Sequence, residues 1–251
     1  SGAKQNIRLE FASGEVIDKE RISANGGFQY QQYFNQDGDL QMGTAIMSAI
    51  EVSLINHDGY FGMIGLDFTE ECTVKYGVMV NGSYEYVSLG IFKGDRVDRI
   101  NSNVIRYTAN DRMALFEKDA SAFIEALKFP VSINQIYHAL CAFVGVESET
   151  TEQLTNGHKT FEANPFDSSD YTCREVLAWI AEAACSYAMI DRNGKAKMAW
   201  FSRIYYTILK SERFNLALSE TVTPMISKLE VYTSYSDMLN TYGSGDNLYV
   251  I

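Results

Sequence analysis

Three histidines, His57, His138 and His158, are the first candidates for chemistry, because imidazole transfers protons near neutral pH and binds metal ions. His57 lies in an expected turn, His138 in an expected helix, and His158 in a long polar stretch. No HExxH or other metal-ligand spacing connects them. The sequence therefore predicts no metal site and no cofactor.

Carboxylates are the second candidates, because two of them can act as general acid and general base in a glycosidase. The chain has 32 acidic residues, so neighbouring carboxylates are expected by chance and a solvated surface is the simpler interpretation. A cell-wall hydrolase, with two carboxyl groups ~5–10 Å apart, stays open as an alternative hypothesis. The acids that stand out are Glu70, Glu71, Asp95, Asp98, Asp111, Asp167 and Asp170.

Nucleophilic catalysis finds no support in the motifs. The sequence has no GxSxG, GxxxxGKS/T or GxGxxG pattern. The cysteines form no CxxC pair and match no zinc spacing, so we expect reduced structural thiols, which suits folding in a cytosol. These cysteines are Cys72, Cys141, Cys173 and Cys185. We therefore expect no enzymatic activity in this chain.

Aromatic residues form one further candidate site. Phe28, Tyr30, Tyr33 and Phe34 cluster among glutamines. Such a surface can bind sugars or other protein chains. Alternatively, half of these side chains face a core along a strand, because positions 28 and 30 are in phase and position 33 is not. Both interpretations stay open, and the first makes the cluster a ligand or partner surface.

Composition and charge narrow the class of protein. The chain has 251 residues, 46% of them hydrophobic and 21% charged, which is typical of a globular protein with a real core. Its formal net charge of −11 disfavours a protein that grips DNA through phosphate contacts. Such a protein can still enclose DNA that passes without specific binding. No apolar run reaches the ~18 residues of a membrane span, so we expect no membrane partner.

The elements that position these residues begin with strands. Between residues 5 and 116, apolar and polar side chains alternate, as in Ile50–Leu54. The clearest unit is Thr73–Phe92, where two alternating runs flank Asn81-Gly82, the loop typical of a type I′ hairpin. Two further short strands are expected around Asp95–Ile100 and Val104–Thr108.

Helical signals follow the strands. Residues 111–128 are rich in Ala, Leu and Phe, with charges at helical intervals. Ser132 and Gln135 form a capping box that opens a helix, and Thr172 and Glu175 form a second one. We therefore expect two capped helices after a first helical segment.

The remaining segments complete the expected order. Residues 147–170 are polar and aperiodic, which is long for a loop in a compact domain. A hairpin is expected to turn at Asn193-Gly194, and further strands are expected between Phe214 and Tyr232.

Segregated strands and helices predict an α+β fold, in which two β-rich parts are joined through helices. We place the first β-rich domain at residues 3–116, a helical part with a long loop at 117–185, and a second β-rich part at 186–251.

Three blocks of sequence, the first of which is Tyr86–Lys118, resemble the phage and prophage tail-tip proteins of bacteria with low-GC genomes. Leu89–Phe92 (LGIF) and Arg106–Leu115 (RYTANDRMAL) are similar to the family's "LGIF" and "ITAYDRL" segments, with Asn110 where the family usually has Tyr. Tyr171–Ala183 resembles "YTYREVLGYIAEA", and Gly245–Ile251 resembles "GDNVLEI". In full-length members "NPL" usually follows the last block, so we expect a C-terminal continuation beyond this chain. Residues 23–48 match no family motif.

The resemblance implies a tail-hub-like fold with two barrel-like β domains. It implies a baseplate hub in which three chains form a pseudo-six-fold ring that joins the tail tube to the distal tip. The partners would be further copies of the chain, the tail tube and distal tail proteins, with DNA passing through the lumen. The location would be the virion tail, and the bacterial cytoplasm during assembly. Any peptidoglycan-degrading activity would lie in the C-terminal continuation. A carbohydrate- or receptor-binding module of a tail is the alternative.

Overall fold

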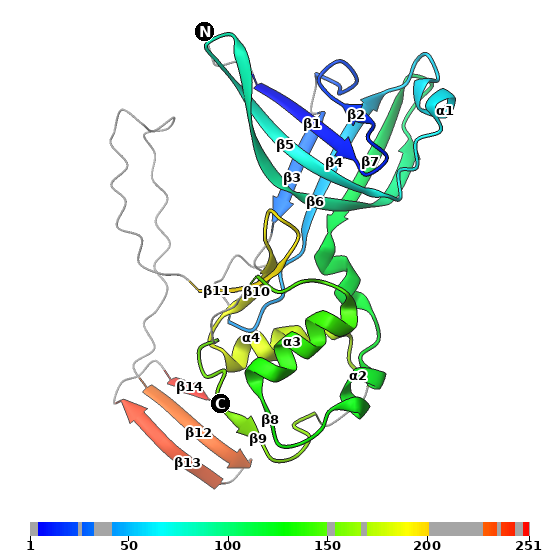
Figure 1. Cartoon of the computed structure of the whole chain (residues 1–251). Helices are drawn as coiled ribbons and strands as arrows, with labels where there is room; N and C mark the ends of the chain where they lie inside the picture. Colours follow the sequence, from blue (N-terminus) through cyan, green and yellow to red (C-terminus); the bar gives the residue numbers. More distant parts are fainter. Residues whose placement is uncertain are drawn as a thin grey trace. The chain divides into compact units, whose positions relative to one another are not determined.

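The computed structural model describes residues 5–24, 27–32, 42–149, 154–166 and 170–200, together with the backbone of strands between residues 228 and 250. The chain divides into two compact units, Ser1–Phe201 and Ser202–Ile251. The described part of the first unit contains a β-sheet and a helical part (Figure 1), so the chain is α+β, as the sequence predicts.

The sheet of the first unit consists of β1 (Gln5–Phe11), β2 (Val16–Ile17), β3 (Phe28–Gln32), β4 (Ser48–Ile55), β5 (Glu71–Val80), β6 (Ser83–Arg99) and β7 (Val104–Asp111). The strands lie in the order β2-β1-β5-β6-β7-β4-β3, and every neighbouring pair is antiparallel. The β5–β6 hairpin turns at Asn81-Gly82, whose φ angles of 48° and 88° confirm the predicted left-handed turn.

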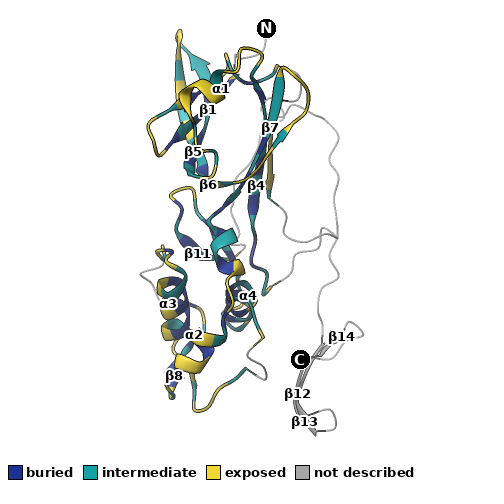
Figure 2. Ribbon diagram, turned by 90° about the vertical axis from the view of Figure 1, so that its right-hand side faces the viewer, coloured by how far each residue is buried: buried dark blue, intermediate teal, exposed yellow. Residues whose placement is uncertain are grey.

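One face of the sheet carries a hydrophobic core. Strand β4 shows the alternation most clearly, because Ile50, Val52 and Leu54 are buried while the residues between them are partly exposed (Figure 2). The largest fully buried side chains of this core include Phe92 and Tyr107. The strand predicted from Ile50–Leu54 is therefore confirmed.

Strand β6 is longer than the sequence predicts. Its 17 residues continue through Asp95–Arg99, which we expected to be a separate strand. Instead, β6 bends at two register shifts. One lies opposite Val74 and Lys75 of β5, and the other lies between Gly94 and Arg96 of β6 itself. At Gly94 the backbone lies close to the segment that precedes β5. A Cβ atom at Gly94 would be 1.7 Å from the carbonyl oxygen of Phe68. Glycine thus lets β6 curve without breaking.

The sheet has two edges, β2 and β3, and the segment that follows β2 in the sequence leads from one edge to the other. Strand β2 pairs with β1, and β3 pairs with β4. Between these strands, Ile22 bridges Leu54, and the N–H of Ile55 donates to the carbonyl oxygen of Arg21 at 2.7 Å. Among the described residues no strand pairing joins β1 to β3, so the named strands form an open sheet.

The helical part contains η1 (Arg112–Glu117), α2 (Ser121–Ala126), α3 (Ile133–Val144) and α4 (Cys173–Ala183), with the short pair β8 (Val131–Ser132) and β9 (Thr160–Phe161). Both predicted capping boxes are confirmed, at Ser132 and Thr172. Residues 111–128 form two short helices, because the backbone is extended at Lys118 and Asp119 bridges Thr172. No helix in the described part of the chain is long and apolar enough to cross a membrane.

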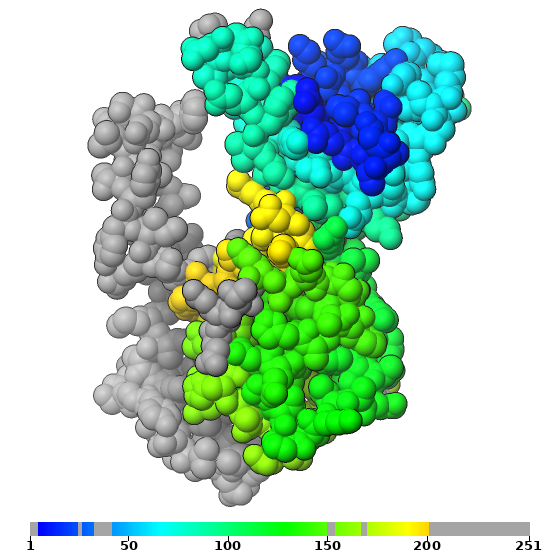
Figure 3. Space-filling model, viewed as in Figure 1, coloured from blue at the N-terminus to red at the C-terminus, as the bar shows by residue number. Residues whose placement is uncertain are grey.

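A hairpin of β10 (Tyr187–Ile190) and β11 (Ala196–Ala199) lies between the helices and the sheet, as the yellow residues in Figure 3 show. Ala188 bridges Ala45 on one side, and Ala196 bridges Ser148 on the other. The hydroxyl of Tyr137 donates to the carbonyl oxygen of Ala196 at 2.9 Å. The expected turn at residues 193–194 is present, with Gly194 at φ 77°.

The second unit contains β12 (Lys228–Ser234), β13 (Asp237–Gly243) and β14 (Leu248–Val250). Strand β12 is central, antiparallel to β13 and parallel to β14. The part of the expected strands before residue 228 lies outside the described residues. The sequence did not predict β13, because its polar residues hide the period of a strand.

Gly94→Ala should lower the free energy of unfolding by more than about 2 kcal/mol, because the new methyl group forces β6 away from Phe68. Gly62→Ala is the matched control, since a Cβ atom there meets nothing within 4 Å. It should leave stability unchanged or raise it by up to about 1 kcal/mol, as Ala favours helix. Urea denaturation of both variants tests this. Equal stability of the two variants would contradict the role of Gly94.

Candidate functional site

The sheet and the helical part of the first unit meet at a set of residues with polar contacts that we call the joint: Glu71, Asp111, Arg112, Arg174 and Gly194. Four of these residues lie in the motif blocks or in the hairpin turn predicted from the sequence. Their side chains and backbone atoms come from β5, β7, η1, α4 and the β10–β11 hairpin.

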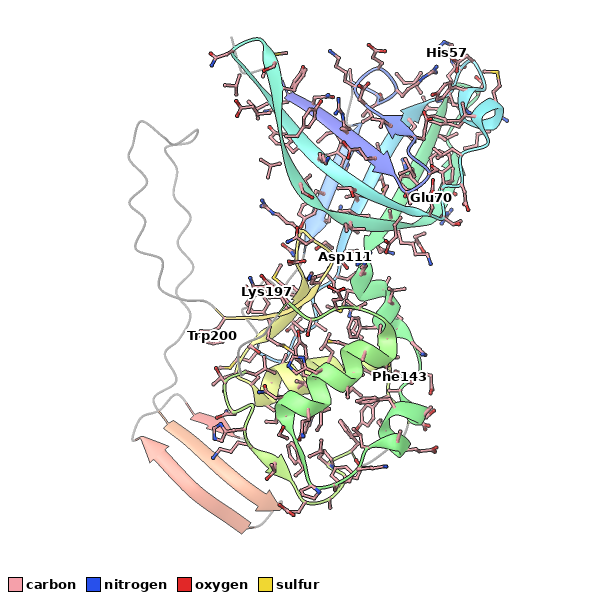
Figure 4. The ribbon with its side chains drawn as sticks, viewed as in Figure 1. His57, Glu70, Asp111, Phe143, Lys197 and Trp200 are labelled. Atoms are coloured by element: carbon pink, nitrogen blue, oxygen red, sulfur yellow. The ribbon has the colours of Figure 1, made fainter. Side chains whose placement is uncertain are left out.

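Asp111 ends β7 and caps η1. It is 3% exposed, and its Oδ1 accepts a hydrogen bond from the N–H of Met113 at 2.9 Å. Its Oδ2 accepts from the N–H of Ser48 at 2.8 Å, which fixes the beginning of β4. Figure 4 labels Asp111 where the sheet and the helical part meet. Burial raises the pKa of Asp111, while the hydrogen bonds from Ser48 and Met113 oppose that shift. The carboxyl group therefore has a structural role, with both oxygens bound to the backbone.

Arg112 forms a fork between the sheet and the hairpin. Its Nε and Nη2 donate to the two carboxylate oxygens of Glu71 at 2.8 and 2.7 Å. Its Nη1 donates to the carbonyl oxygen of Gly194 at 3.2 Å. The hydrogen bonds from Arg112 lower the pKa of Glu71, so this carboxylate is ionised at neutral pH. A bidentate pair of this kind fixes direction as well as distance.

Arg174 makes the corresponding contacts from α4. Its Nε and Nη2 donate to the carbonyl oxygen of Ala45 at 3.0 and 2.8 Å, and its Nη1 donates to Glu117 Oε1 at 2.7 Å. Ala45 belongs to the segment that bridges β10 and then leads into β4. One guanidinium thus ties α4, η1 and the segment before β4 together.

A small cavity lies beside the joint, between β3, β6 and the β10–β11 hairpin. The ring of Tyr30 contacts that of Phe92 edge-on, with centroids 6.3 Å apart. The cavity is lined by Tyr30, Gln32, Ser48, Leu89, Gly90, Ile91, Phe92, Asp111, Met189, Ile190, Asp191 and Arg192. The LGIF block therefore forms part of the surface on which the hairpin is seated.

The aromatic cluster lies partly on edge strand β3. Phe28 is partly buried against the core of the sheet, whereas Tyr30 is 39% exposed. Both share one face of β3, in phase as the sequence predicts. Tyr33 and Phe34 lie outside the described residues. Of the two described residues of this cluster, Tyr30 is the more exposed.

The histidines lie on separate elements. His57 is in the turn before the first short helix, and exposed His158 is in the turn before β9. His138 lies on α3, with its Nδ1 3.0 Å from Ser148 Oγ. Among the described residues, no group of three or more His, Cys, Asp or Glu side chains is placed to hold a metal ion.

The cysteines are free thiols, of which Cys72, Cys141 and Cys173 are buried and Cys185 is exposed. Burial raises the pKa of Cys141 to about 12 and that of Cys72 to about 11, and it also raises the pKa of Cys173. Because the thiolate is the nucleophile, the raised pKa values favour the less reactive protonated thiol at these three positions. This matches the structural role expected for buried cysteines.

The prominent carboxylates have different partners. Glu70 accepts hydrogen bonds from the backbone N–H and hydroxyl of Ser13, whereas its neighbour Glu71 binds Arg112. Asp98 binds Arg96 at 2.7 Å. Asp167 lies outside the described residues. Glu70 thus holds a surface loop, Glu71 is part of the joint, and Asp98 pairs with a residue of its own strand.

The contacts that Arg112 and Arg174 make across the joint were not predicted from the sequence. A signal was present, because each of these arginines stands in a motif block. Their acceptors could not be read from the sequence, since Arg174 and Ala45 are 129 residues apart and Arg112 and Gly194 are 82 apart.

Comparisons with known proteins give structural matches. No family model matches the chain, and no curated protein matches it in sequence. The 43 kDa tail protein of prophage MuSo2 from Shewanella oneidensis matches with a TM-score of 0.58 and 13% identity, over 98% of this chain and 71% of that one. The prophage tail protein gp18 from Listeria monocytogenes EGD-e matches with a TM-score of 0.54 and 10% identity, over the same shares. At these identities the likeness shows the fold, which this chain shares with prophage tail proteins.

The ion pair of the joint predicts a dependence of stability on pH. Because the folded-state pKa of Glu71 is lowered, its stabilisation is present above its ordinary pKa of about 4.3 and is lost as the pH falls through the lower folded value. Glu71→Gln should lower the free energy of unfolding by about 1 kcal/mol at pH 7, as the pair is partly exposed to solvent. The difference from the unchanged protein should disappear below about pH 3.

Urea denaturation between acid and neutral pH measures this difference. Added salt should reduce it at pH 7, because salt screens a partly exposed pair. Parallel stability curves for the two proteins over the whole pH range would contradict the role given to Glu71.

Proposed function

We propose that this chain is a structural component of a phage or prophage tail, acting as the hub at the tail tip that joins the tail tube to the distal tip. The observation that carries the proposal is the fold, which follows two prophage tail proteins over 98% of the chain. The position of the motif blocks supports it. The NDR and YTCRE segments supply Asp111, Arg112 and Arg174 to the joint, and these residues bind side-chain or backbone groups of other segments. The LGIF segment lines the cavity beside the joint.

The proposed architecture has two barrel-like β domains, at residues 3–116 and 186–251, connected by a helical part at 117–185. Two features support it. In the first domain, the sheet is bent at β6, and the segment that follows β2 bridges β4 at the far edge through Ile22 and Leu54. Towards the C-terminus, β12, β13 and β14 form a separate β-sheet. Two similar domains per chain would let three chains form a ring of six.

The proposed partners are two further copies of the chain, the tail tube and distal tail proteins. The aromatic cluster of Phe28, Tyr30, Tyr33 and Phe34 is the proposed contact. Its described part lies on β3, which among the described residues is an edge strand that carries an exposed tyrosine. DNA would pass through the ring without specific binding, as the net charge of −11 disfavours phosphate contacts. The chain would act in the virion tail after assembly in the bacterial cytoplasm.

Labelling of virions tests the proposed position. Antibodies against the folded chain, bound to purified particles and imaged by electron microscopy, should mark the distal end of the tail. Chemical cross-linking of the same particles should give a band at three times the mass of the protein in those particles. Labels along the whole tail, or on the head, would refute the hub. If the labels mark the distal end but the largest cross-linked product contains two copies, the trimer is refuted and the position at the tail tip stands.

Tyr30→Ala tests the β3 surface. We expect at least about a tenfold loss of the chain from assembled tails, because an exposed aromatic ring at an interface contributes strongly to binding. Tyr84→Ala, at a partly exposed tyrosine on the β5–β6 hairpin, is the control and should assemble normally. Quantitative blotting of purified tails measures both. Normal assembly of Tyr30→Ala would exclude this residue from the contact. Loss of binding to host glycans, with normal assembly, would favour the carbohydrate-binding alternative.

A further inference from the structure

A short helix at one end of the sheet holds two large apolar side chains in solvent. In α1 (Tyr60–Ile64), Met63 is 72% exposed and Ile64 is 39% exposed. Met63 is the most exposed of the large hydrophobic side chains among the described residues. Gly59 and Gly65, with φ angles of 70° and 64°, bound the helix on both sides. Left-handed glycines allow this abrupt entry and exit.

The remainder of α1 is fixed against the sheet. Phe61 is 4% exposed, and its ring lies 5.4 Å from that of Phe68. The hydroxyl of Tyr60 donates to Glu15 Oε1 at 2.7 Å, and the guanidinium of Arg21 lies 4.0 Å from the centroid of the Tyr60 ring. The helix is therefore anchored on one side while Met63 and Ile64 are presented on the other. Such preorganisation lowers the entropic cost of binding a partner.

Carboxylates surround this apolar surface. A cleft beside α1 is lined by Ile64 and Leu66 and by the acidic residues Glu15, Asp67 and Glu70. Figure 4 shows Glu70 on the side of the sheet where α1 lies. Hydrogen bonds from Thr69 lower the pKa of Asp67, so this carboxylate is charged at neutral pH.

The nearby cations leave this charge in place. Arg21 is bound to Asp58, with its Nη1 2.9 and 2.8 Å from the two carboxylate oxygens. Lys19 lies over the ring of Tyr84, with its Nζ 5.6 Å from the centroid. The surface of Glu15, Met63, Ile64, Asp67 and Glu70, which we call the α1 tip, is therefore apolar at its centre and negative at its rim.

We propose that the α1 tip is a docking surface for a partner protein that presents apolar side chains flanked by lysine or arginine. Burial of Met63 and Ile64 would supply the hydrophobic contribution, and the acidic rim would select the partner. A symmetric contact between the α1 tips of two copies of this chain is disfavoured, because it would bring like charges together. This inference is independent of the proposed hub function.

A peptide titration of the full chain tests the proposal. The probe is a fluorescent amphipathic peptide of leucine and lysine, and its counterpart has glutamate in place of lysine. We expect the lysine peptide to bind, and to bind at least about tenfold more weakly to Met63→Ser/Ile64→Ser. Val87→Ser, which changes another exposed apolar side chain of the sheet, is the matched control and should bind like the unchanged chain.

The rim is tested separately with Glu15→Gln/Asp67→Asn, which keeps an acceptor oxygen at each position. It should weaken binding of the lysine peptide at low salt and have less effect at high salt, because salt screens exposed charges. Absence of binding, binding unchanged by Met63→Ser/Ile64→Ser, or equal binding of the glutamate peptide would each overturn the proposal. Sedimentation velocity covers the remaining occupant, since a dimer of the chain that Met63→Ser/Ile64→Ser dissociates would identify a second copy instead.

Discussion

The first unit has two separate hydrophobic cores, and the polar connection between them determines how the sheet and the helices are held. One core lies on the inner face of the sheet, and the other lies among η1, α3, α4 and the β10–β11 hairpin. Apolar contacts alone define direction poorly, because they are not directional. The fork of Arg112 between Glu71 and Gly194, with both oxygens of Asp111 bound to backbone N–H groups, supplies the missing directions. Burying a carboxylate costs free energy, and the two hydrogen bonds that Asp111 accepts from backbone N–H groups offset that cost.

Elements defined by local sequence could be predicted well. The Asn81-Gly82 turn and the capping boxes at Ser132 and Thr172 depend on residues within a few positions of one another, so their patterns are complete in the sequence. The continuous β6 could not be predicted, because a break was expected where Gly94 allows a bend against Phe68. That contact is between residues from different strands and loops.

Long-range pairings account for most of what the sequence did not reveal about the site. Phe28 and Tyr30 were placed in phase on one strand from the sequence, but the place of β3 at the edge of the described sheet depends on its pairing with β4. The arginines of the joint stood in recognisable blocks, whereas their acceptors, Ala45 and Gly194, offer backbone carbonyls that any residue could provide. Because every residue has a backbone carbonyl group, the residue type does not indicate which carbonyl accepts such a hydrogen bond.

The joint and the α1 tip are linked by the two strands that run between them. Strand β4 begins at Ser48, whose N–H binds Asp111, and ends at Ile55, one residue before Asn56, whose side chain accepts a hydrogen bond from the N–H of Phe61. Strand β7 pairs with β4 from Val104 to Asn110 and leads directly into Asp111. A continuous antiparallel ladder is stiff along its length, since each residue is held by its neighbour across the pair. Docking at α1 would therefore act on a frame whose other end is fixed to the helices.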